Sequence, residues 1–366
     1  MKFRSERDAL AEALNTAARA VSARASNPVL SGLMITCEGN QLTVIGTDLD
    51  LSIRVDLEVI GVADGSAVVP ARLSSDIVRA LEPGAVTFDA KDDQVEISAS
   101  KSSLELRCFP TVEFPAVAQA AAPSTTIEAA VIADALRQVN RAASKDDARP
   151  ILTAVLFTKQ DEHVRLVATD SYRLALRDLP EVTASLPDDL LVPERALKEI
   201  ARVSATLPEG ASVGISVTDA EVGFTVGNAT ITTRKLEGSY PDYRQLIPDT
   251  YPNSLHAGKE TLLAALRRVK LMTADQTTPV KLQLRPGGVD LSVVAPERGE
   301  AKESVDGDFV GEETTIAFNP AYLIEGIEAI AGDEVIIETT DGSRPATVRS
   351  SLSRDFQYLL MPVRVS

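Results

Sequence analysis

Few residues in this chain have the types and spacing that catalysis or phosphate binding requires. Gly258, Lys259 and Glu260 come nearest to a phosphate-binding loop, but no Ser or Thr follows the lysine to hold magnesium, and the upstream glycine is missing. The two histidines, His163 and His256, lie far apart in the sequence. We therefore predict surface or loop histidines, no ATP site and no cofactor.

Asp170 and Ser171 could suggest a hydrolase, because an acid stands beside a hydroxyl nucleophile. A nucleophilic serine also needs a base and an oxyanion site, and the chain has neither a G-x-S-x-G turn nor a convincing histidine partner. Turn chemistry explains this pair adequately. Other carboxylates are scattered through turns and indicate no metal site. We expect no enzyme, and the hydrolase alternative predicts turnover that Ser171→Ala abolishes.

Cations at helical spacing are more informative. Arg137, Arg141, Lys145 and Arg149 recur every fourth residue, which places their side chains along one face wherever the segment is helical. Other cations at similar spacing are Arg72, Arg79, Arg195, Lys198 and Arg202. Either a basic binding surface or a solvated face paired with acids would give this pattern.

One cation recurs in each third of the chain. Arg19, Arg141 and Lys270 each stand nine residues before a repeated proline. This repetition favours a shared basic surface over a solvated face. The second helix expected in the last third carries Glu325 and Glu328 and no cation, so such a surface would be uneven.

The prolines belong to a threefold repeat whose period is the size of a domain. Pro28 and Thr47 match Pro150 and Thr169 at a spacing of 122 residues, and a fainter third copy begins near Pro279. The second half of each repeat follows one of three anchor prolines: Pro70, Pro193 and Pro320. Each copy can own a core, which predicts triplication rather than a solenoid. The predicted domains span 1–122, 123–251 and 252–366.

The repeats contain recognisable elements. Apolar spacing predicts a helix early in each unit, over 5–21, 127–143 and 259–272, and a second helix follows each anchor proline. Alternating residues predict strands over 49–55, 164–176 and 356–365. With two helices and about eight strands per domain, the predicted class is α+β.

Composition limits the setting of the protein. The formal net charge is −16, which speaks against strong binding to a polyanion unless the cations gather on one surface. The charged N-terminus does not resemble a signal peptide, and no run of about eighteen apolar residues occurs. We expect no membrane partner and a cytoplasmic protein with Cys37 and Cys108 as buried thiols.

Four motifs carry a family resemblance, together with the triplication. They are Gly46-Thr47-Asp48-Leu49, Ala168-Thr169-Asp170 with Arg173-Leu174, Tyr240-Pro241-Asp242-Tyr243-Arg244 and Met361-Pro362-Val363-Arg364. Over essentially its whole length the chain resembles the beta subunit of bacterial replicative DNA polymerases, the sliding clamp. The resemblance implies that two copies join head to tail into a six-domain ring, with helices lining the hole and sheets outside. Such a ring encircles double-stranded DNA without reading its sequence and stays with the nucleoid.

The resemblance and the helical cations together give a predicted DNA-binding set: Arg19, Arg24, Arg141, Lys145, Arg149, Lys198 and Lys270. Arg24 enters through the family pattern alone, and Arg149 matches a basic position in the loop after the middle helix. Pro150 and Ile151 replace a tyrosine pair that family members can carry after that arginine. The resemblance also assigns Leu271 and Met272 to the dimer interface, although ordinary core packing would explain them too.

A peptide-binding pocket between the middle and last domains is the remaining implication. Its partners would be the replicative polymerase catalytic subunit, the clamp loader and other proteins with short clamp-binding peptides. The matching positions are Leu152, Thr169, Arg173, Leu174, Pro241, Leu246, Asn319, Tyr322, Met361, Pro362, Val363 and Arg364. Gln245 and Thr277 depart from the residues that family members can carry. The main alternative is a triplicated scaffold that binds proteins without encircling DNA, and dimeric ring closure would separate the two.

Overall fold

The computed structural model describes all residues except 23–26, 184–185, 188, 274–277 and 365–366. The described chain contains six α-helices and 25 strands, divided between two compact units. The first unit comprises 1–133 and 195–235, and the second comprises 134–194 and 236–366. The predicted α+β class is confirmed, with two helices and eight or nine strands in each third of the chain.

The first third of the chain lies entirely in the first unit. Its elements are β1 Lys2–Glu6, α1 Arg7–Ala17, β2 Gly32–Glu38, β3 Gln41–Thr47, β4 Leu51–Glu58, β5 Ile60–Ala63, β6 Gly65–Pro70, α2 Ala71–Ala80, β7 Ala85–Lys91, β8 Gln94–Ala99 and β9 Ser102–Arg107. Strands β5-β1-β7-β8-β9 form a five-stranded antiparallel sheet in that order.

The middle third contributes strands to both units. Its elements are β10 Thr125–Glu128, α3 Ala129–Val139, β11 Ala154–Gln160, β12 His163–Thr169, β13 Arg173–Leu179, β14 Leu190–Pro193, α4 Glu194–Ser204, β15 Ser212–Val217, β16 Glu221–Val226 and β17 Ala229–Arg234. Within the first unit, β17 pairs with β4 and completes an eight-stranded sheet, β10-β15-β16-β17-β4-β3-β2-β6. That sheet therefore crosses the boundary between two repeats.

The last third belongs to the second unit. Its elements are β18 Asn253–Gly258, α5 Lys259–Lys270, β19 Val280–Arg285, β20 Gly288–Ala295, β21 Gly299–Val310, β22 Thr314–Phe318, α6 Pro320–Ala329, β23 Glu334–Thr339, β24 Ala346–Ser350 and β25 Phe356–Leu360. A twelve-stranded sheet runs β14-β11-β12-β13-β25-β24-β23-β18-β21-β20-β19-β22, and β13 pairs with β25 at its repeat boundary. The compact units follow these shared sheets, so the domain boundaries predicted after residues 122 and 251 stay a prediction.

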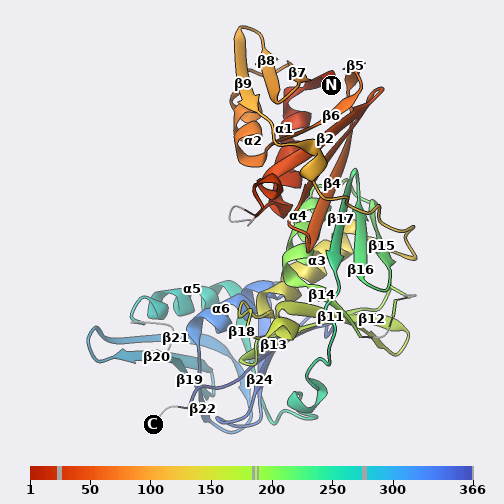
Figure 1. The fold of residues 1–366 in the computed structure, drawn as a ribbon. Coiled ribbons are helices and arrows are strands. Elements are labelled where there is room, and N and C mark those ends of the chain that lie inside the picture. The colour runs from red at the N-terminus through yellow and green to blue at the C-terminus, as the bar shows by residue number, and fades with distance from the viewer. Residues whose placement is uncertain (23–26, 184–185, 188, 274–277, 365–366) are drawn as a thin grey trace. The chain divides into compact units, whose positions relative to one another are not determined.

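The first helix of each repeat buries the same four positions. Leu10, Ala13, Leu14 and Ala17 of α1 are matched by Ile132, Ala135, Leu136 and Val139 of α3 and by Leu262, Ala265, Leu266 and Val269 of α5. This spacing gives one apolar stripe per helix. In the first unit α1 packs on α2, β3 and β4, and in the second α5 packs on α6, β20 and β21 (Figure 1). Each buried leucine contributes about 1.5–3 kcal/mol to stability.

Several predicted helices and strands begin or end at other residues in the structure. The helices predicted from residues 5 and 127 begin two residues later, because a short strand precedes each, and both close in 3-10 turns, 18–20 and 140–142. Leu49, predicted as the start of a strand, lies in a turn with φ of 82°. The segment 164–176 is two strands joined by a turn, and the last strand ends at Leu360, with the predicted end at 365 outside the described residues.

Candidate functional site

The turn between β12 and β13 is built by side chains of the repeated Thr-Asp motif. Thr169 Oγ1 donates to the Arg173 carbonyl at 2.6 Å and accepts the Ser171 N–H at 3.1 Å. Asp170 Oδ1 accepts the N–H groups of Tyr172 and Arg173 at 2.9 and 3.0 Å. Short polar side chains stabilise such turns by replacing backbone partners, as predicted for Asp170 and Ser171.

Arg173 ends this turn with its guanidinium buried. Its Nε donates to Asp170 Oδ2 at 3.0 Å, and its Nη1 donates to the Tyr358 hydroxyl at 3.1 Å and to the Glu325 carboxylate. The Tyr322 ring lies 4.2 Å from its Cζ. Desolvation would lower the pKa of Arg173, but Tyr358 and Glu325 outweigh it and hold that pKa above its usual value. The guanidinium is therefore a fixed charge.

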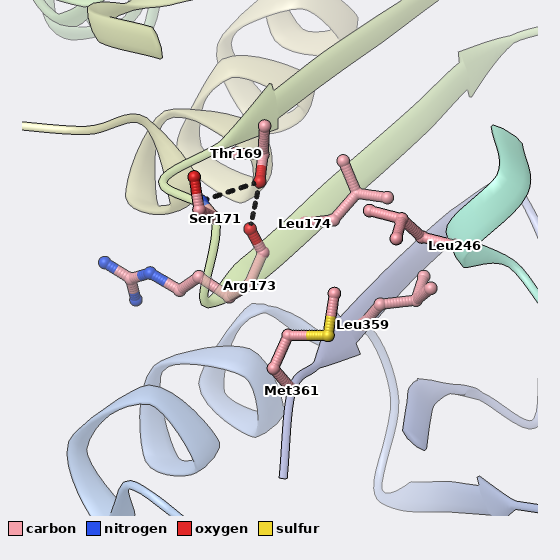
Figure 2. Close-up of a pocket in the computed structure, with 7 residues that line it drawn as sticks. All are labelled: Thr169, Ser171, Arg173, Leu174, Leu246, Leu359 and Met361. Atoms are coloured by element: carbon pink, nitrogen blue, oxygen red, sulfur yellow. Dashed lines mark hydrogen bonds between the residues drawn. The ribbon is translucent and has the colours of Figure 1, made fainter. Parts of the chain in front are cut away.

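A small apolar depression, partly open to solvent, lies beside the turn. Its lining residues are Thr169, Ser171, Arg173, Leu174, Leu246, Leu359 and Met361. Figure 2 shows the side chains of Leu174, Leu246, Leu359 and Met361 gathered together, while the guanidinium end of Arg173 points away from them. Its apolar lining suits apolar side chains rather than a charged cofactor.

Five predicted pocket residues line this depression: Thr169, Arg173, Leu174, Leu246 and Met361. Leu359 was missed, although its signal was in the sequence. It is the cross-strand partner of Leu174 and stands two residues before Met361, so strand alternation puts it on the same face as both. Ser171 was considered only as a turn residue or nucleophile, and its hydroxyl accepts from Arg149 Nη1 at 3.1 Å.

The other predicted pocket residues do not line the depression: Leu152, Pro241, Asn319, Tyr322, Pro362, Val363 and Arg364. Asn319 caps α6, where its side chain accepts the Ala321 N–H at 2.9 Å. Beyond β25 the chain is extended, and successive odd-numbered residues bond to two different segments. The Met361 N–H donates to the Tyr172 carbonyl at 2.9 Å, and the Val363 N–H donates to the Ala317 carbonyl at 2.8 Å. Leu152 is buried, Pro241 and Arg364 are exposed, and Pro362 is half-buried.

The middle series of cations does not form one helix face. Helix α3 ends at Val139, and only Arg137 lies within it, with Arg141 in the following 3-10 turn. Lys145 and Arg149 lie in the loop beyond that turn, so the every-fourth spacing does not place them on a helix face. The helix predicted to reach residue 143 ends at Val139 and continues only as the 3-10 turn 140–142.

The helix arginines are paired with carboxylates within each unit. In the first unit, Arg19 lies 3.4 Å from Glu199 and Arg202 lies 2.9 Å from the same side chain. In the second, Arg141 lies 3.1 Å from Glu328. Similar pairs hold Arg137, Arg149, Arg195 and Arg267. Within the predicted set, the described cations that are exposed and outside these pairs are three lysines: Lys145, Lys198 and Lys270. Arg24 lies outside the described residues, as does Thr277.

The cation that recurs before each proline does not keep one structural position. Arg19 and Arg141 each stand thirteenth when counted from the first residue of α1 and α3, whereas Lys270 stands twelfth in α5. The matching burial patterns of the helices make Leu271, not Lys270, the counterpart of the two arginines. Leu271 is 77% exposed and is not a core residue. Met272 is half-buried and lies near Gly299.

Other candidate chemistry finds little support in the structure. Among the described residues no group of histidine, cysteine, aspartate and glutamate is arranged to hold a metal ion. His163 is half-buried in strand β12, and His256 lies 3.7 Å from Glu334. Cys37 is buried as predicted, but Cys108 is only partly buried. No helix in the described part of the chain is long and apolar enough to cross a membrane.

Solved structures share this fold along the entire chain. A sliding clamp from Bartonella birtlesii, solved with griselimycin bound, superposes with a TM-score of 0.93 at 27% identity and covers 100% of both chains. The DNA polymerase sliding clamp from Caulobacter crescentus gives a TM-score of 0.90 at 30% identity, again over 100% of both chains. The fold is that of a sliding clamp.

Sequence relatives give the family. The DNA polymerase III beta subunit models match in order, with the N-terminal domain over residues 1–118, the central domain over 126–242 and the C-terminal domain over 244–364. The beta sliding clamp of Streptomyces coelicolor is 33% identical, with 100% of both chains covered. The chain belongs to the bacterial DNA polymerase III beta subunit family, the beta sliding clamps. It is therefore a DNA clamp of the replicative polymerase, a processivity factor and not an enzyme.

Proposed function

We propose that two copies of this chain close head to tail into a ring around duplex DNA and tether the replicative polymerase through the apolar depression beside Arg173. The observation that carries this proposal is a repeated strand pairing. The strand after each Thr-Asp turn, β4 or β13, pairs with the last strand of the next repeat, β17 or β25. A third pairing of this kind has no partner within the described chain.

The two strands left over by this pattern are β9 and β21. Strand β9 is an edge of the five-stranded sheet, and residues 299–306 of β21 pair only with β20. An exposed edge presents unpaired N–H and C=O groups that can pair with a strand of another chain. Pairing β9 of one copy with β21 of another repeats the internal junction, and a heterologous contact of this kind closes a ring when its rotation permits.

Leu271 supports the same contact. Its counterparts Arg19 and Arg141 are linked to Glu199 and Glu328, which lie on the second helix of the following repeat. After the first helix of the last repeat an exposed leucine stands in place of that charge, and it is suited to pack against a second copy. We expect Leu271→Asp to convert the dimer to a monomer, measured by analytical ultracentrifugation, whereas Leu352→Asp, at another exposed leucine, leaves the dimer intact.

The free lysines Lys145, Lys198 and Lys270 are proposed as the main phosphate contacts. Their weak, sequence-blind attraction holds the ring near DNA without stopping it from sliding. Each charge reversal to glutamate should weaken salt-dependent DNA binding, reducing the slope of log affinity against log salt by about one for each phosphate that is no longer neutralised. Lys159→Glu on strand β11 is the matched control and should leave the slope unchanged.

The apolar depression is proposed to take anchor side chains of short peptides from the polymerase catalytic subunit, the clamp loader and repair proteins. Its four apolar residues supply burial, and Thr169 and Ser171 are polar residues of its lining. The double variant Leu174→Ala with Leu246→Ala should abolish peptide binding, because it removes apolar surface from the depression. Truncating a buried leucine to alanine costs about 2–5 kcal/mol. We expect these interactions to take place in the cytoplasm, on the nucleoid.

The ring is tested by loading the protein onto nicked circular DNA with a cognate loader and ATP, then cutting the DNA once in moderately high salt. Release on cutting is the expected result, because a topological link ends when the circle does. Retention on linear DNA would show that direct contacts dominate. If a competent loader never placed the protein on the circle, a scaffold that binds proteins without encircling DNA would replace the ring.

A further inference from the structure

Helix α6 is joined to elements of the middle repeat along one face. Glu325 accepts from Arg173, Glu328 accepts from Arg141 Nη1 at 3.1 Å, and the Ala329 carbonyl accepts from Gln138 Nε2 at 3.0 Å. Tyr322, Glu325 and Glu328 follow one another at intervals of three residues, which places them on neighbouring turns of the same face. The contacts thus form a ladder along α6.

Two side chains of α6 reach the turn that lines the depression: the Tyr322 ring lies against Arg173 and Tyr172, and Glu325 supplies the charged contact. Arg173 is 7% exposed and has two carboxylate partners, Asp170 within its own turn and Glu325 on α6. A buried guanidinium requires both charge compensation and satisfied donors. Without Glu325 it would keep Asp170 and the Tyr358 hydroxyl but lose the charged partner that fixes it to α6.

We propose that Glu325 is a positioning residue of the peptide pocket, which acts by holding Arg173 and so keeps the Thr169–Arg173 turn in place. This inference rests on the proposed peptide-binding function. The turn supplies Thr169, Ser171 and Arg173 to the wall, and the Tyr172 carbonyl in it also accepts the Met361 N–H at 2.9 Å. A loosened turn would therefore disturb both sides of the depression.

The geometry separates this role from direct binding by Arg173. In Figure 2 its guanidinium points away from the four apolar side chains. Its hydrogen bonds go to Glu325 and Tyr358 instead. If Arg173 contacted the peptide by charge, replacing Arg173 would weaken peptide binding whichever residue stands at position 325. If Arg173 and Glu325 together organise the wall, replacing either residue should weaken peptide binding as much as replacing both.

The test measures anisotropy of a fluorescein-labelled synthetic peptide that carries a glutamine and several leucine anchors. Glu325→Ala should weaken binding about tenfold, equivalent to about 1.4 kcal/mol, and Glu325→Gln should recover part of this because an amide oxygen still accepts. Glu328→Gln, one rung further along α6, is the matched control and should stay within about twofold of the unchanged chain. In an Arg173→Met background Glu325→Ala should have no further effect.

Unchanged affinity in Glu325→Ala, or a full tenfold loss added to that of Arg173→Met, would overturn the inference. A second measurement does not depend on the peptide. Hydrogen exchange at the Tyr172 and Arg173 amides, both bonded to Asp170, should become faster in Glu325→Ala and not in Glu328→Gln. If the unchanged chain binds no peptide, the pocket proposal fails, whereas this exchange experiment still decides the role of Glu325.

Discussion

The turn that follows β3 and the turn that follows β12 share their side-chain bonds to the backbone and differ at the residue that ends them. Thr47 and Thr169 bond the second residue after them, and Asp48 and Asp170 each accept two backbone N–H groups. The position that ends the turn is a buried leucine, Leu51, in the first case and Arg173 in the second.

This difference distinguishes the residues that the shared turn conformation requires from the arginine that is specific to the second turn. An aliphatic residue at Leu51 completes the first turn, so the shared conformation does not require an arginine at this position. In the first unit Asp48 instead pairs with Arg195, whose side chain is 51% exposed. The buried charge cluster around Arg173 therefore points to a role specific to the second turn, consistent with its place beside the apolar depression.

Replacing the arginine of each pair should give the largest contrast. Arg173→Met leaves buried Asp170 without its cation and should lower the free energy of unfolding by about 3 kcal/mol. Arg195→Met removes a half-exposed pair and should cost at most about 1 kcal/mol. Urea unfolding followed by circular dichroism measures both, since the chain has no tryptophan. Equal losses would remove the distinction between the turns.

Removing the aspartates probes what the turns have in common. Asp48→Ala and Asp170→Ala each take away an acceptor for two backbone N–H groups and should cost about 2 kcal/mol locally. Hydrogen exchange at the Leu51 and Arg173 amides should speed up in the corresponding variant. If only the second turn responded, the first would be held by its strands rather than by its side chains.

Glycine at the left-handed positions should produce a smaller effect of opposite sign. Leu49 and Ser171 adopt φ of 82° and 79°, a region that glycine enters without a Cβ penalty. Leu49→Gly should raise the free energy of unfolding by about 0.5–1 kcal/mol. Ser171→Gly gains the same relief but loses the bond from Arg149, so its net change should be near zero. Equal stabilisation by both would mean that this bond contributes nothing.

Acid should weaken the ladder beside the second turn. Desolvation raises the pKa of Glu328, but Arg267 and Arg141 outweigh it and hold that pKa below its usual value of 4.5. Because the folded pKa is the lower one, the stabilisation is present above pH 4.5 and is lost as pH falls through the folded pKa. In a plot of the thermal unfolding midpoint against pH, Glu328→Gln should reduce the fall of the midpoint at acidic pH. Glu260→Gln, which changes an exposed glutamate of α5, should leave that fall as it is.

The repeat made much of the fold predictable, because a domain-length period and buried helix positions are both visible in sequence. The turn conformation was also legible, since Thr-Asp pairs favour side-chain bonds to the backbone. Leu49 was assigned to the wrong element because an apolar residue in left-handed conformation breaks the usual link between hydrophobicity and strands. Helix α3 was predicted to run past its actual end at Val139, because the spacing of apolar residues does not show at which residue a helix stops.

The site was predictable where it lies on strands and less so where it depends on pairing across repeats. Leu174 and Met361 follow from alternation and from the family motifs, and Leu359 could have been added by the same rule. The partnership of Arg173 with Glu325 joins residues 152 positions apart, and no local pattern gives such a contact. Leu271 was indicated only by the family resemblance until the three first helices could be aligned by burial.

The unpaired edges β9 and β21 give each chain two unlike ends. On the proposed pairing each copy offers two different strand edges, and the chemistry of those edges does not limit how many copies can join. Only the bend contributed by each copy decides whether the series closes or continues as a filament. Copy number would thus be controlled in part by the junctions inside the chain.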